Sequence, residues 1–337
     1  MASEMASEMA NETTASEASA NEAGRETHVI FGAGQIGPLL AGELIARGKR
    51  VRIVRRGAPS TTAPGLEWMR GDVRDEAFAR EAARGAAVVY NCVNPSDYST
   101  WARELRPLFR GVMRAARSAG ARLVVLDNLY MYGPTKGEPM RESTPMRPSA
   151  LKSNLRAQLA TELFEAHDKG LLTATSGRAS DYFGKGTSEM SLLGAPALAK
   201  LAAGKSLDVA GDPDLVHAFS YAPDVAKGLA ILGTSEESWG RPWHLPVSWQ
   251  GTTRELVALH ARALGARAKL RVAPKWLLEI AGVFVPTAGA LVEMLYQWDA
   301  PFVVDDSAFR ARFGVEATPP EQAVRETVET FRARLAA

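Results

Sequence analysis

The stretch "VIFGAGQIG" is the feature that most limits how this chain can fold. It places Gly32, Gly34 and Gly37 in the pattern G-x-G-x-x-G, directly after a short apolar run and at the start of a helical pattern. In such a strand–turn–helix unit the first glycine allows a tight turn and the second lets the backbone approach a diphosphate. The third lets the helix pack closely on the strand. The pattern predicts a dinucleotide-binding unit whose phosphate loop includes Gln35 and Ile36.

The chain up to about residue 178 repeats this alternation of strand and helix. Strands joined by helices form right-handed βαβ units around a buried parallel sheet. The expected fold class is therefore α/β, a doubly wound Rossmann fold. The predicted strands are "HVIFG", "RVRIVRR", "LEWMRGD", "AAVVYNCV", "ARLVVLD" and "LLTATSGR", and the predicted helices lie at 35–48 and near 75–84, 99–119 and 150–169.

After Arg178 the alternation loosens, because Gly and Pro become frequent and the apolar runs become short. The predicted strands are "WHLPV" and "LRVAP", and the predicted helices lie near 252–264, 275–283, 287–297 and 320–334. These elements cannot build a second nucleotide-binding fold. We therefore expect a Rossmann domain at 28–178 and a smaller substrate-binding lobe at 179–337, interleaved with the last Rossmann elements.

The first 27 residues have a different character from the rest of the chain. They contain a near-perfect repeat of Met-Ala-Ser-Glu and show no apolar periodicity, which predicts a disordered acidic tail at 1–27. The tail lacks the basic and apolar regions of a secretory signal and is too acidic for a mitochondrial one. It holds six Glu and one Arg, so the remainder of the chain carries the positive charge.

That positive charge is spread without a basic block, which suits an anionic cofactor and predicts no nucleic-acid partner. Cys92 is the single cysteine, which excludes an internal disulfide and a multi-cysteine metal site, and we expect no metal. No apolar run approaches the roughly 18 residues of a membrane span. We expect no membrane partner and a cytoplasmic location.

The end of the second predicted strand, "RIVRRG", bears on the choice of dinucleotide. An acidic residue there would accept hydrogen bonds from the ribose 2′-hydroxyl of NAD. Arg55 and Arg56 stand here instead, and two guanidiniums suit a 2′-phosphate. NADP is the expected cofactor and NAD the alternative, while a solvated strand end would account for the same arginines without a ligand.

Two later strand ends complete the expected cofactor site. The stretch "GDVRD" offers Asp72 and Val73 at the adenine edge. The stretch "YNCVNP" places Cys92, Val93 and Asn94 beside the ribose and nicotinamide. Because Cys92 lies in an apolar run with no neighbouring His, a buried structural thiol is favoured over a nucleophile.

With these motifs the chain resembles the short-chain dehydrogenase/reductase superfamily, in its extended, NAD-dependent epimerase/dehydratase-like form, over about residues 28–315. The resemblance rests on "FGAGQIG", "GDV", "VVLDNLYMYG", "RASDYFGKG" and "HAFSYAPDVAKGL", which occur in the family's order. It implies a cofactor-dependent enzyme. Extended members usually have the spacing G-x-x-G-x-x-G, so the chain looks like an atypical member.

The resemblance also exposes a missing catalytic group. The family has a Ser or Thr that orients the substrate oxygen, a Tyr that exchanges its proton, and a Lys four residues later. In this chain the three positions fall on Asn128, Lys152 and Arg156. The spacing of four residues keeps the last two on one helix face, next to the cofactor, but neither is a phenol.

Three explanations of this replacement stay open. In the first, Lys152 is itself the acid, next to Arg156 and the positive nicotinamide. In the second, Tyr130 or Tyr132 in the loop after the fifth strand of the Rossmann domain donates the proton. In the third, no donor is needed, because hydride passes to an activated electrophile or the cofactor is only bound.

An aromatic set frames the expected substrate pocket, which favours a flat or hydrophobic compound over a nucleotide sugar. A nucleotide sugar would want more Arg and Lys in the C-terminal half. His217 has no nucleophile or metal partners in register, so it is either a hydrogen-bonded structural histidine or a substrate-orienting one. The substrate candidates are Tyr98, Trp101, Tyr182 and His217, with Phe183, Tyr221, Tyr296 and Trp298 around them.

Together these features predict an NAD(P)-dependent oxidoreductase that passes hydride to a carbonyl or a conjugated C=C or C=N of a small aromatic or hydrophobic metabolite. The alternatives are an epimerase or dehydratase with a retained cofactor, and a non-catalytic NADP sensor. Helices 99–119 and 150–169 correspond to those through which many family members dimerise. Leu155, Leu159, Leu163 and Phe164 form a stripe that suits either a homodimer seam or core packing.

Overall fold

A computed structural model of the chain describes residues 25–59, 62–187, 191–273, 289 and 292–336. The predicted tail, apart from its last three residues, lies outside the described residues. So does the predicted helix at 275–283, and the one at 287–297 lies only partly within them.

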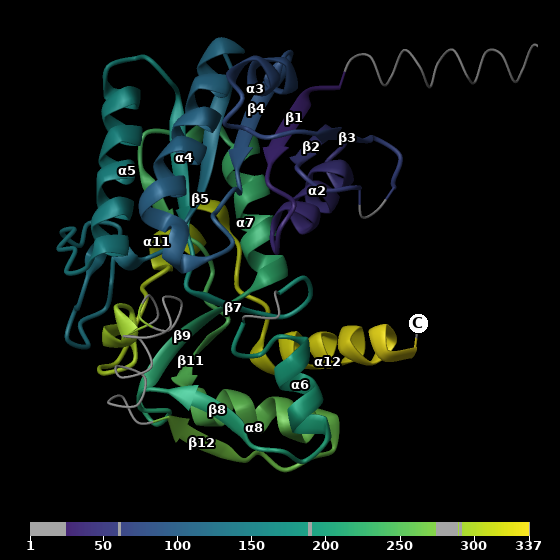
Figure 1. The fold of residues 1–337 in the computed structure, drawn as a ribbon, viewed down its shortest axis with the longest axis vertical. Helices are drawn as coiled ribbons and strands as arrows, with labels where there is room; N and C mark the ends of the chain where they lie inside the picture. Colours follow the sequence, from purple (N-terminus) through teal and green to yellow (C-terminus); the bar gives the residue numbers. More distant parts are fainter. Residues whose placement is uncertain (1–24, 60–61, 188–190, 274–288, 290–291, 337) are drawn as a thin grey trace, which may run out of the picture.

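Seven parallel strands form one central sheet, in the order β10-β6-β5-β4-β1-β2-β3 (Figure 1). The order runs outward from β1 to β3 and then restarts at β4 on the other side of β1. This reversal creates the crevice in which doubly wound sheets bind their ligands. The strands are β1 (Thr27–Phe31), β2 (Arg50–Arg55), β3 (Leu66–Arg70), β4 (Ala86–Asn91), β5 (Arg122–Asp127), β6 (Ala174–Arg178) and β10 (Pro242–His244).

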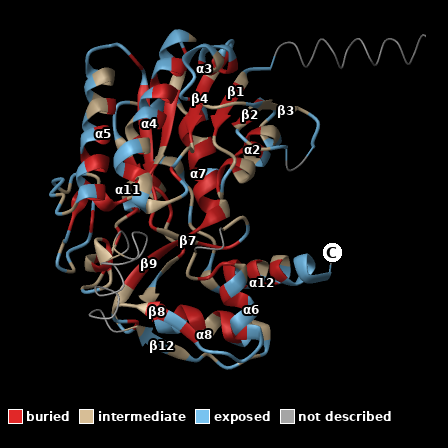
Figure 2. Ribbon diagram, viewed as in Figure 1, coloured by how far each residue is buried: buried red, intermediate tan, exposed pale blue. Residues whose placement is uncertain are grey.

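Helices cover both faces of the sheet, and this confirms the predicted doubly wound α/β fold. Alternate side chains of each strand point to opposite faces, so Val29 and Phe31 join one core while Ile30 joins the other. Figure 2 shows the buried strands between the two helical layers. One layer contains α3 (Glu76–Ala83), α4 (Trp101–Ser118) and α5 (Leu151–Asp168), and the other contains α2 (Gly37–Ala46), α7 (Ala222–Thr234) and α11 (Ser307–Phe313).

The leucine stripe of α5 packs inside the chain. Leu155, Leu159 and Leu163 are at most 4% exposed and share a hydrophobic core with Leu105 and Val112 of α4. Core packing therefore explains these leucines. A dimer through α4 and α5 would have to use their outer faces, and it stays a prediction.

The remaining elements form a second body, here called the C-terminal lobe. Apart from β9, its strands have only three or four residues, too few for sequence periodicity to show, and β7, β8, β9, β11 and α6 were not predicted. The lobe contains a three-stranded sheet of β7 (Asp181–Phe183), β9 (Val216–Tyr221) and β11 (Trp249–Thr252), a pair of β8 (Leu207–Ala210) and β12 (Leu270–Ala273), and the helices α6 (Ala195–Ala202), α8 (Thr253–Leu264) and α12 (Pro320–Ala336).

The chain passes between the central sheet and the C-terminal lobe several times. It leaves the sheet after β6, returns through α7 and β10, leaves again for β11, and returns once more at α11 before ending in α12. None of the helices in the described ranges combines the length and apolar character needed to cross a bilayer.

Candidate functional site

The three glycines of the first loop have distinct surroundings. Gly32 has a φ of +108°, and a Cβ there would lie 2.5 Å from the carbonyl oxygen of Cys92. A Cβ on Gly37 would overlap the carbonyl oxygen of Gly32. At Gly34, in contrast, no heavy atom of the described residues lies within 4 Å of an added Cβ. The first and third glycines are thus required by the fold itself, while the second leaves open space above the loop.

Helix α2 begins at this loop without a side-chain cap. Ile36 precedes the helix and is buried, and among the described residues it provides no side-chain cap for the first turn. Unsatisfied N–H groups at a helix start attract anions. The loop and α2 therefore form a surface that can hold a diphosphate.

At the end of β2, Arg56 is exposed and Arg55 curls over Gly57, whose added Cβ would lie 3.2 Å from the Arg55 guanidinium. Asp72 forms an ion pair with Arg74 at 2.6 Å. Hydrogen bonds from Arg74 and the nearby charge of Arg56 lower the pKa of Asp72. Arginines thus outnumber carboxylates here.

The neighbouring Val73 differs from Asp72 in being buried. Its carbonyl oxygen lies 2.5 Å from an ideal Cβ position at Gly111 of α4. Val73 therefore packs the loop onto α4, and its predicted place at the adenine edge stays a prediction.

Two asparagine side chains, at the end of β4 and just after it, accept hydrogen bonds. The side chain of Asn91 accepts a hydrogen bond from the Val93 amide, and the side chain of Asn94 accepts one from Arg156. Burial raises the pKa of the Cys92 thiol to about 12. Cys92 is therefore protonated at neutral pH, as expected of a structural thiol.

Arg156 lies on α5, four residues after Lys152. It is 6% exposed. It donates to Asp127 at 3.2 Å and to Asn94 at 2.7 Å, and its guanidinium lies 4.8 Å from the ring centre of Trp101. The guanidinium is thereby fixed between the ends of β4 and β5, at the carboxyl edge of the sheet.

Lys152 is also buried, with 2% exposure. Its Nζ donates to Glu293 at 2.6 Å, and its backbone amide donates to the other oxygen of the same carboxylate, also at 2.6 Å. The ammonium lies 5.7 Å from the ring centre of Tyr98. Glu293 was missed by the sequence reasoning because it lies far along the chain from Lys152.

Tyr130 belongs to the same cluster as Lys152. Its hydroxyl forms a 2.9 Å hydrogen bond with the hydroxyl of Tyr98, and both rings stack on Trp101. Burial raises the pKa of both tyrosines. Asn128 accepts a hydrogen bond from the amide of Tyr130 through its side chain, which makes it part of the turn.

Tyr132 lies in a separate buried chain of hydrogen bonds. Arg178 donates to its hydroxyl oxygen at 2.6 Å, and the hydroxyl lies 2.7 Å from Nε2 of His244. Nδ1 of His244 donates to the carbonyl oxygen of Asp305, so Nε2 is the acceptor and Tyr132 the donor. The proton of Tyr132 is thus already committed within the protein, and its ring is 1% exposed.

The aromatic substrate candidates divide into two groups. Tyr182 is partly exposed, and burial raises its pKa, while the charge of Arg156 acts in the opposite direction. Phe183 and Tyr221 are at most 2% exposed and pack in the core of the C-terminal lobe. The expectation that these last two frame the substrate is wrong, because they hold the lobe together.

Two further aromatic candidates approach the site from the segment before α11. The hydroxyl of Tyr296 lies 3.4 Å from the carbonyl oxygen of Tyr130, and burial raises its pKa. Trp298 stacks on His217 with ring centres 3.7 Å apart. Nε2 of His217 lies 2.8 Å from the carboxylate of Asp181, a residue that the sequence reasoning did not single out.

The chain matches the model of the NAD dependent epimerase/dehydratase family over residues 29–243. The match covers more than half of the chain, which therefore belongs to this family. A UDP-glucose 4-epimerase of Streptomyces lividans is 30% identical over 142 residues, which make up 36% of this chain and 41% of that protein. The similarity thus spans about two fifths of the length of this curated relative.

Solved structures share the fold across almost the whole chain. A UDP-glucose 4-epimerase from Thermotoga maritima, solved with UDP-glucose, has a TM-score of 0.74 at 17% identity, over 92% of this chain and 99% of its own. A dTDP-glucose 4,6-dehydratase from Streptomyces venezuelae, solved with NAD bound, has a TM-score of 0.74 at 18% identity, over 93% and 98%. At these identities the likeness establishes the architecture alone.

Proposed function

We propose that the protein is an enzyme that binds a nicotinamide dinucleotide across the carboxyl edge of its sheet. It would use the cofactor as an epimerase or dehydratase does, removing hydride from a hydroxyl-bearing carbon and later returning it. The family membership and the relatives named above support this type of reaction. The observation that carries the proposal is the loop at Gly34, where no described atom lies within 4 Å of an added Cβ, next to the start of α2, which has no side-chain cap from Ile36.

The bound dinucleotide would supply the hydride acceptor, and the chain's own residues would orient the reactants. In this proposal Arg156 takes the place of the family's lysine that holds the nicotinamide ribose, and Asp127 and Asn94 fix its guanidinium. A rigid, planar donor of this kind suits paired hydroxyls.

Proton transfer is proposed for Lys152, with Glu293 as the residue that positions it. The ion pair joins an amine and a carboxylate at 2.6 Å, so the cluster holds both an acid and a base. Tyr130 is the alternative, because its hydroxyl reaches the same cluster through Tyr98. Tyr132 is disfavoured as the donor by its contacts with Arg178 and His244.

A second function, one-way reduction of a carbonyl or conjugated double bond, is favoured by one observation. Lys152, which the resemblance aligns with the family's tyrosine, is ion-paired with Glu293. An epimerase or dehydratase depends more on a group that both removes and returns protons than a reductase does.

The test compares two glycine variants of the full-length protein. Gly34→Ala adds a methyl group in open space, where only the ligand would meet it, and Gly42→Ala adds one elsewhere on α2 with equally open surroundings. Calorimetry should show that Gly34→Ala weakens dinucleotide binding by about tenfold or more, while Gly42→Ala binds like the wild type. Both should unfold within about 1 kcal/mol of the wild type.

The same titrations decide between the two dinucleotides. The relatives' names support NAD, whereas Arg55 and Arg56 favour the 2′-phosphate of NADP. In Arg55→Ala/Arg56→Ala the affinity for NADP should fall by about tenfold relative to that for NAD. Failure of the wild type to bind either dinucleotide would refute the proposed function.

A further inference from the structure

A tight turn after β7 carries Lys185 at its corner. The turn spans residues 184–187, and the amide and the hydroxyl of Thr187 both donate to the carbonyl oxygen of Gly184, at 3.3 and 2.8 Å. Gly186 has a φ of +85°, a conformation that the third residue of a type II turn requires. Lys185 is the second residue of this turn and is exposed. Its side chain therefore extends away from the turn.

The backbone of this turn packs against the glycine loop. A Cβ added to Gly186 would lie 2.8 Å from the carbonyl oxygen of Gln35 and 3.2 Å from Cδ1 of Leu39. Gln35 belongs to the loop, and Leu39 belongs to the first turn of α2. Lys185 is thus one residue away from a direct contact between the C-terminal lobe and the loop that would hold the cofactor.

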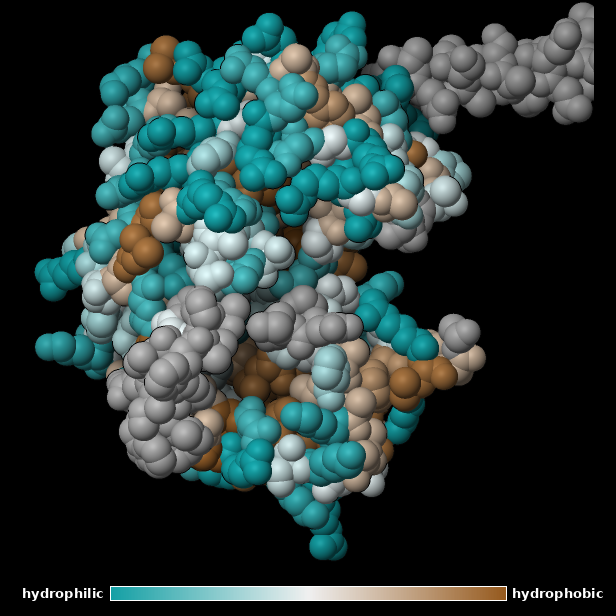
Figure 3. Space-filling view, viewed as in Figure 1, coloured by the Kyte–Doolittle hydropathy of each residue, from teal (hydrophilic) through white to brown (hydrophobic). Residues whose placement is uncertain are grey.

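The other side of the turn is supported by the C-terminal lobe. A Cβ added to Gly184 would lie 2.4 Å from the ring of Tyr221. The hydroxyl of Tyr221 donates to Glu326 of α12 at 2.7 Å. In the space-filling view a notch separates the part that holds the sheet from α12 of the lobe (Figure 3). The turn therefore contacts both of the parts that border this notch.

The ammonium of Lys185 is not used by the described part of the protein. It forms no ion pair and no hydrogen bond with the described residues. Two carboxylates of neighbouring elements have other partners. Asp181, at the start of β7, lies 2.8 Å from Nε2 of His217. Glu326 accepts the hydrogen bond from Tyr221. The charge of Lys185 is therefore available to a ligand.

The length and charge of this side chain suit a diphosphate. A lysine stem reaches about as far as two residues of extended chain, which exceeds the one residue between Lys185 and the contact at Gly186. Gln35, on the other side of this contact, directly follows Gly34, where no described atom lies within 4 Å of an added Cβ. A compact ammonium binds phosphate oxygens as a point charge.

We propose that Lys185 binds the diphosphate of the dinucleotide, together with the backbone of the glycine loop. The anion would then be held by one group from each of the two bodies of the molecule. Binding of the cofactor would fix the C-terminal lobe against the sheet. This inference rests on the proposed function, because it needs a dinucleotide at Gly34.

Calorimetry on the full-length protein tests the charge, with whichever dinucleotide the wild type binds. In about 50 mM NaCl, Lys185→Gln should bind about fivefold more weakly than the wild type, as the loss of one partly exposed ion pair predicts. In about 1 M NaCl the difference should fall below about twofold, because salt screens exposed charges. Lys185→Arg keeps the charge and should bind within about twofold of the wild type.

The matched control is Lys205→Gln in the same lobe. Lys205 is also exposed, follows a glycine with a φ of +66°, and has no ion pair with the described residues. This variant should bind like the wild type at both salt concentrations. Amide hydrogen exchange gives a second readout. Saturating dinucleotide should slow exchange at 184–187 by about threefold or more in the wild type and in Lys205→Gln, but not in Lys185→Gln.

Two results would overturn the inference. One is binding by Lys185→Gln within about twofold of the wild type at low salt. The other is a loss of equal size at both salt concentrations, which would come from packing of the turn and not from its charge. Failure of the wild type to bind either dinucleotide would instead refute the proposed function, and this inference with it.

Discussion

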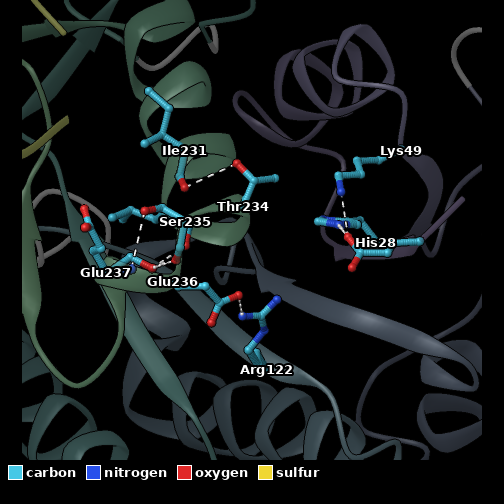
Figure 4. A network of polar contacts seen from close by, with 11 residues as sticks. His28, Lys49, Arg122, Ile231, Thr234, Ser235, Glu236 and Glu237 are labelled. Carbon is cyan, nitrogen blue, oxygen red and sulfur yellow. Dashed lines mark hydrogen bonds and ion pairs between the residues drawn. The ribbon is translucent and has the colours of Figure 1, made fainter. Parts of the chain in front are cut away.

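Ion pairs at the amino ends of the parallel strands, here the amino edge, are exposed, whereas those at the carboxyl ends, the carboxyl edge, are buried. At the amino edge, Arg122 pairs with Glu236 and Lys49 pairs with Glu26, and the two carboxylates are 81% and 51% exposed (Figure 4). At the carboxyl edge, the two pairs formed by Arg156 and Lys152 have side chains that are at most 20% exposed.

The difference indicates what each set of charges does. An exposed pair contributes little and can be lost without harm. A buried pair costs desolvation, and apolar residues of similar size would often serve stability as well. The carboxyl-edge pairs therefore have their main value in holding charged groups in place where a cofactor and substrate would lie. Four measurements would break or sharpen this comparison.

The largest effect is expected for Arg156→Ala. The substitution leaves the carboxylate of Asp127, which is 5% exposed, without its cation. Breaking a buried pair in this way should lower the free energy of unfolding by about 3–5 kcal/mol, measured in urea. Asp127→Asn/Arg156→Met should recover part of the loss, because no charge stays unpaired. A loss below about 1 kcal/mol would show that the pair behaves like a surface one.

A second effect concerns one histidine near each edge. Burial lowers the pKa of His28, in β1, and of His244, at the end of β10, to about 4. Both are neutral in the folded protein, whereas they titrate near pH 6.5 when unfolded. Stability is therefore full above pH 6.5 and falls as the pH drops from 6.5 towards 4, by about 3 kcal/mol at most for each histidine.

Unfolding at pH 7 and pH 5 checks this prediction. His28→Gln and His244→Gln should each lose less stability than the wild type between the two pH values. His260, whose pKa burial also lowers to about 4, keeps part of the slope in both variants. Unchanged slopes would mean that these rings do not titrate on unfolding.

A smaller effect is expected for Glu293→Gln. The amide keeps the shape and one acceptor but removes the charge opposite Lys152. The free energy of unfolding should fall by about 2 kcal/mol, because the ammonium stays buried without its counter-charge. Recovery in Lys152→Met/Glu293→Gln would identify the unpaired charge as the cause, and a loss as large in the double variant would point to packing instead.

The smallest effect is expected at the amino edge. Glu236→Ala removes an exposed partner of Arg122, whose guanidinium still lies 4.8 Å from the ring centre of Trp239. The free energy of unfolding should change by less than about 1 kcal/mol. A larger change would erase the contrast between the two edges.

The sequence predicted the central sheet and the glycine loop after β1 because both depend on local patterns. The glycine spacing marks the turn after β1, while the assignment of Lys152 and Arg156 to the family's catalytic positions stays a prediction. Their charge partners were harder to find. Glu293 lies 141 positions from Lys152, and no local pattern connects them. The prediction that Phe183 and Tyr221 line a pocket was wrong for a related reason. The sequence pattern around an aromatic residue in a strand is the same whether its side chain faces a ligand or a core.

The repeated passage of the chain between the sheet and the C-terminal lobe has a mechanical consequence. A lobe tethered by one linker can swing open widely, but this lobe is joined to the sheet at β6, α7, β10 and α11. A motion that admitted a ligand would have to bend all these connections together. We therefore expect a shallow twist of the two bodies against each other, with the floor of the crevice almost stationary.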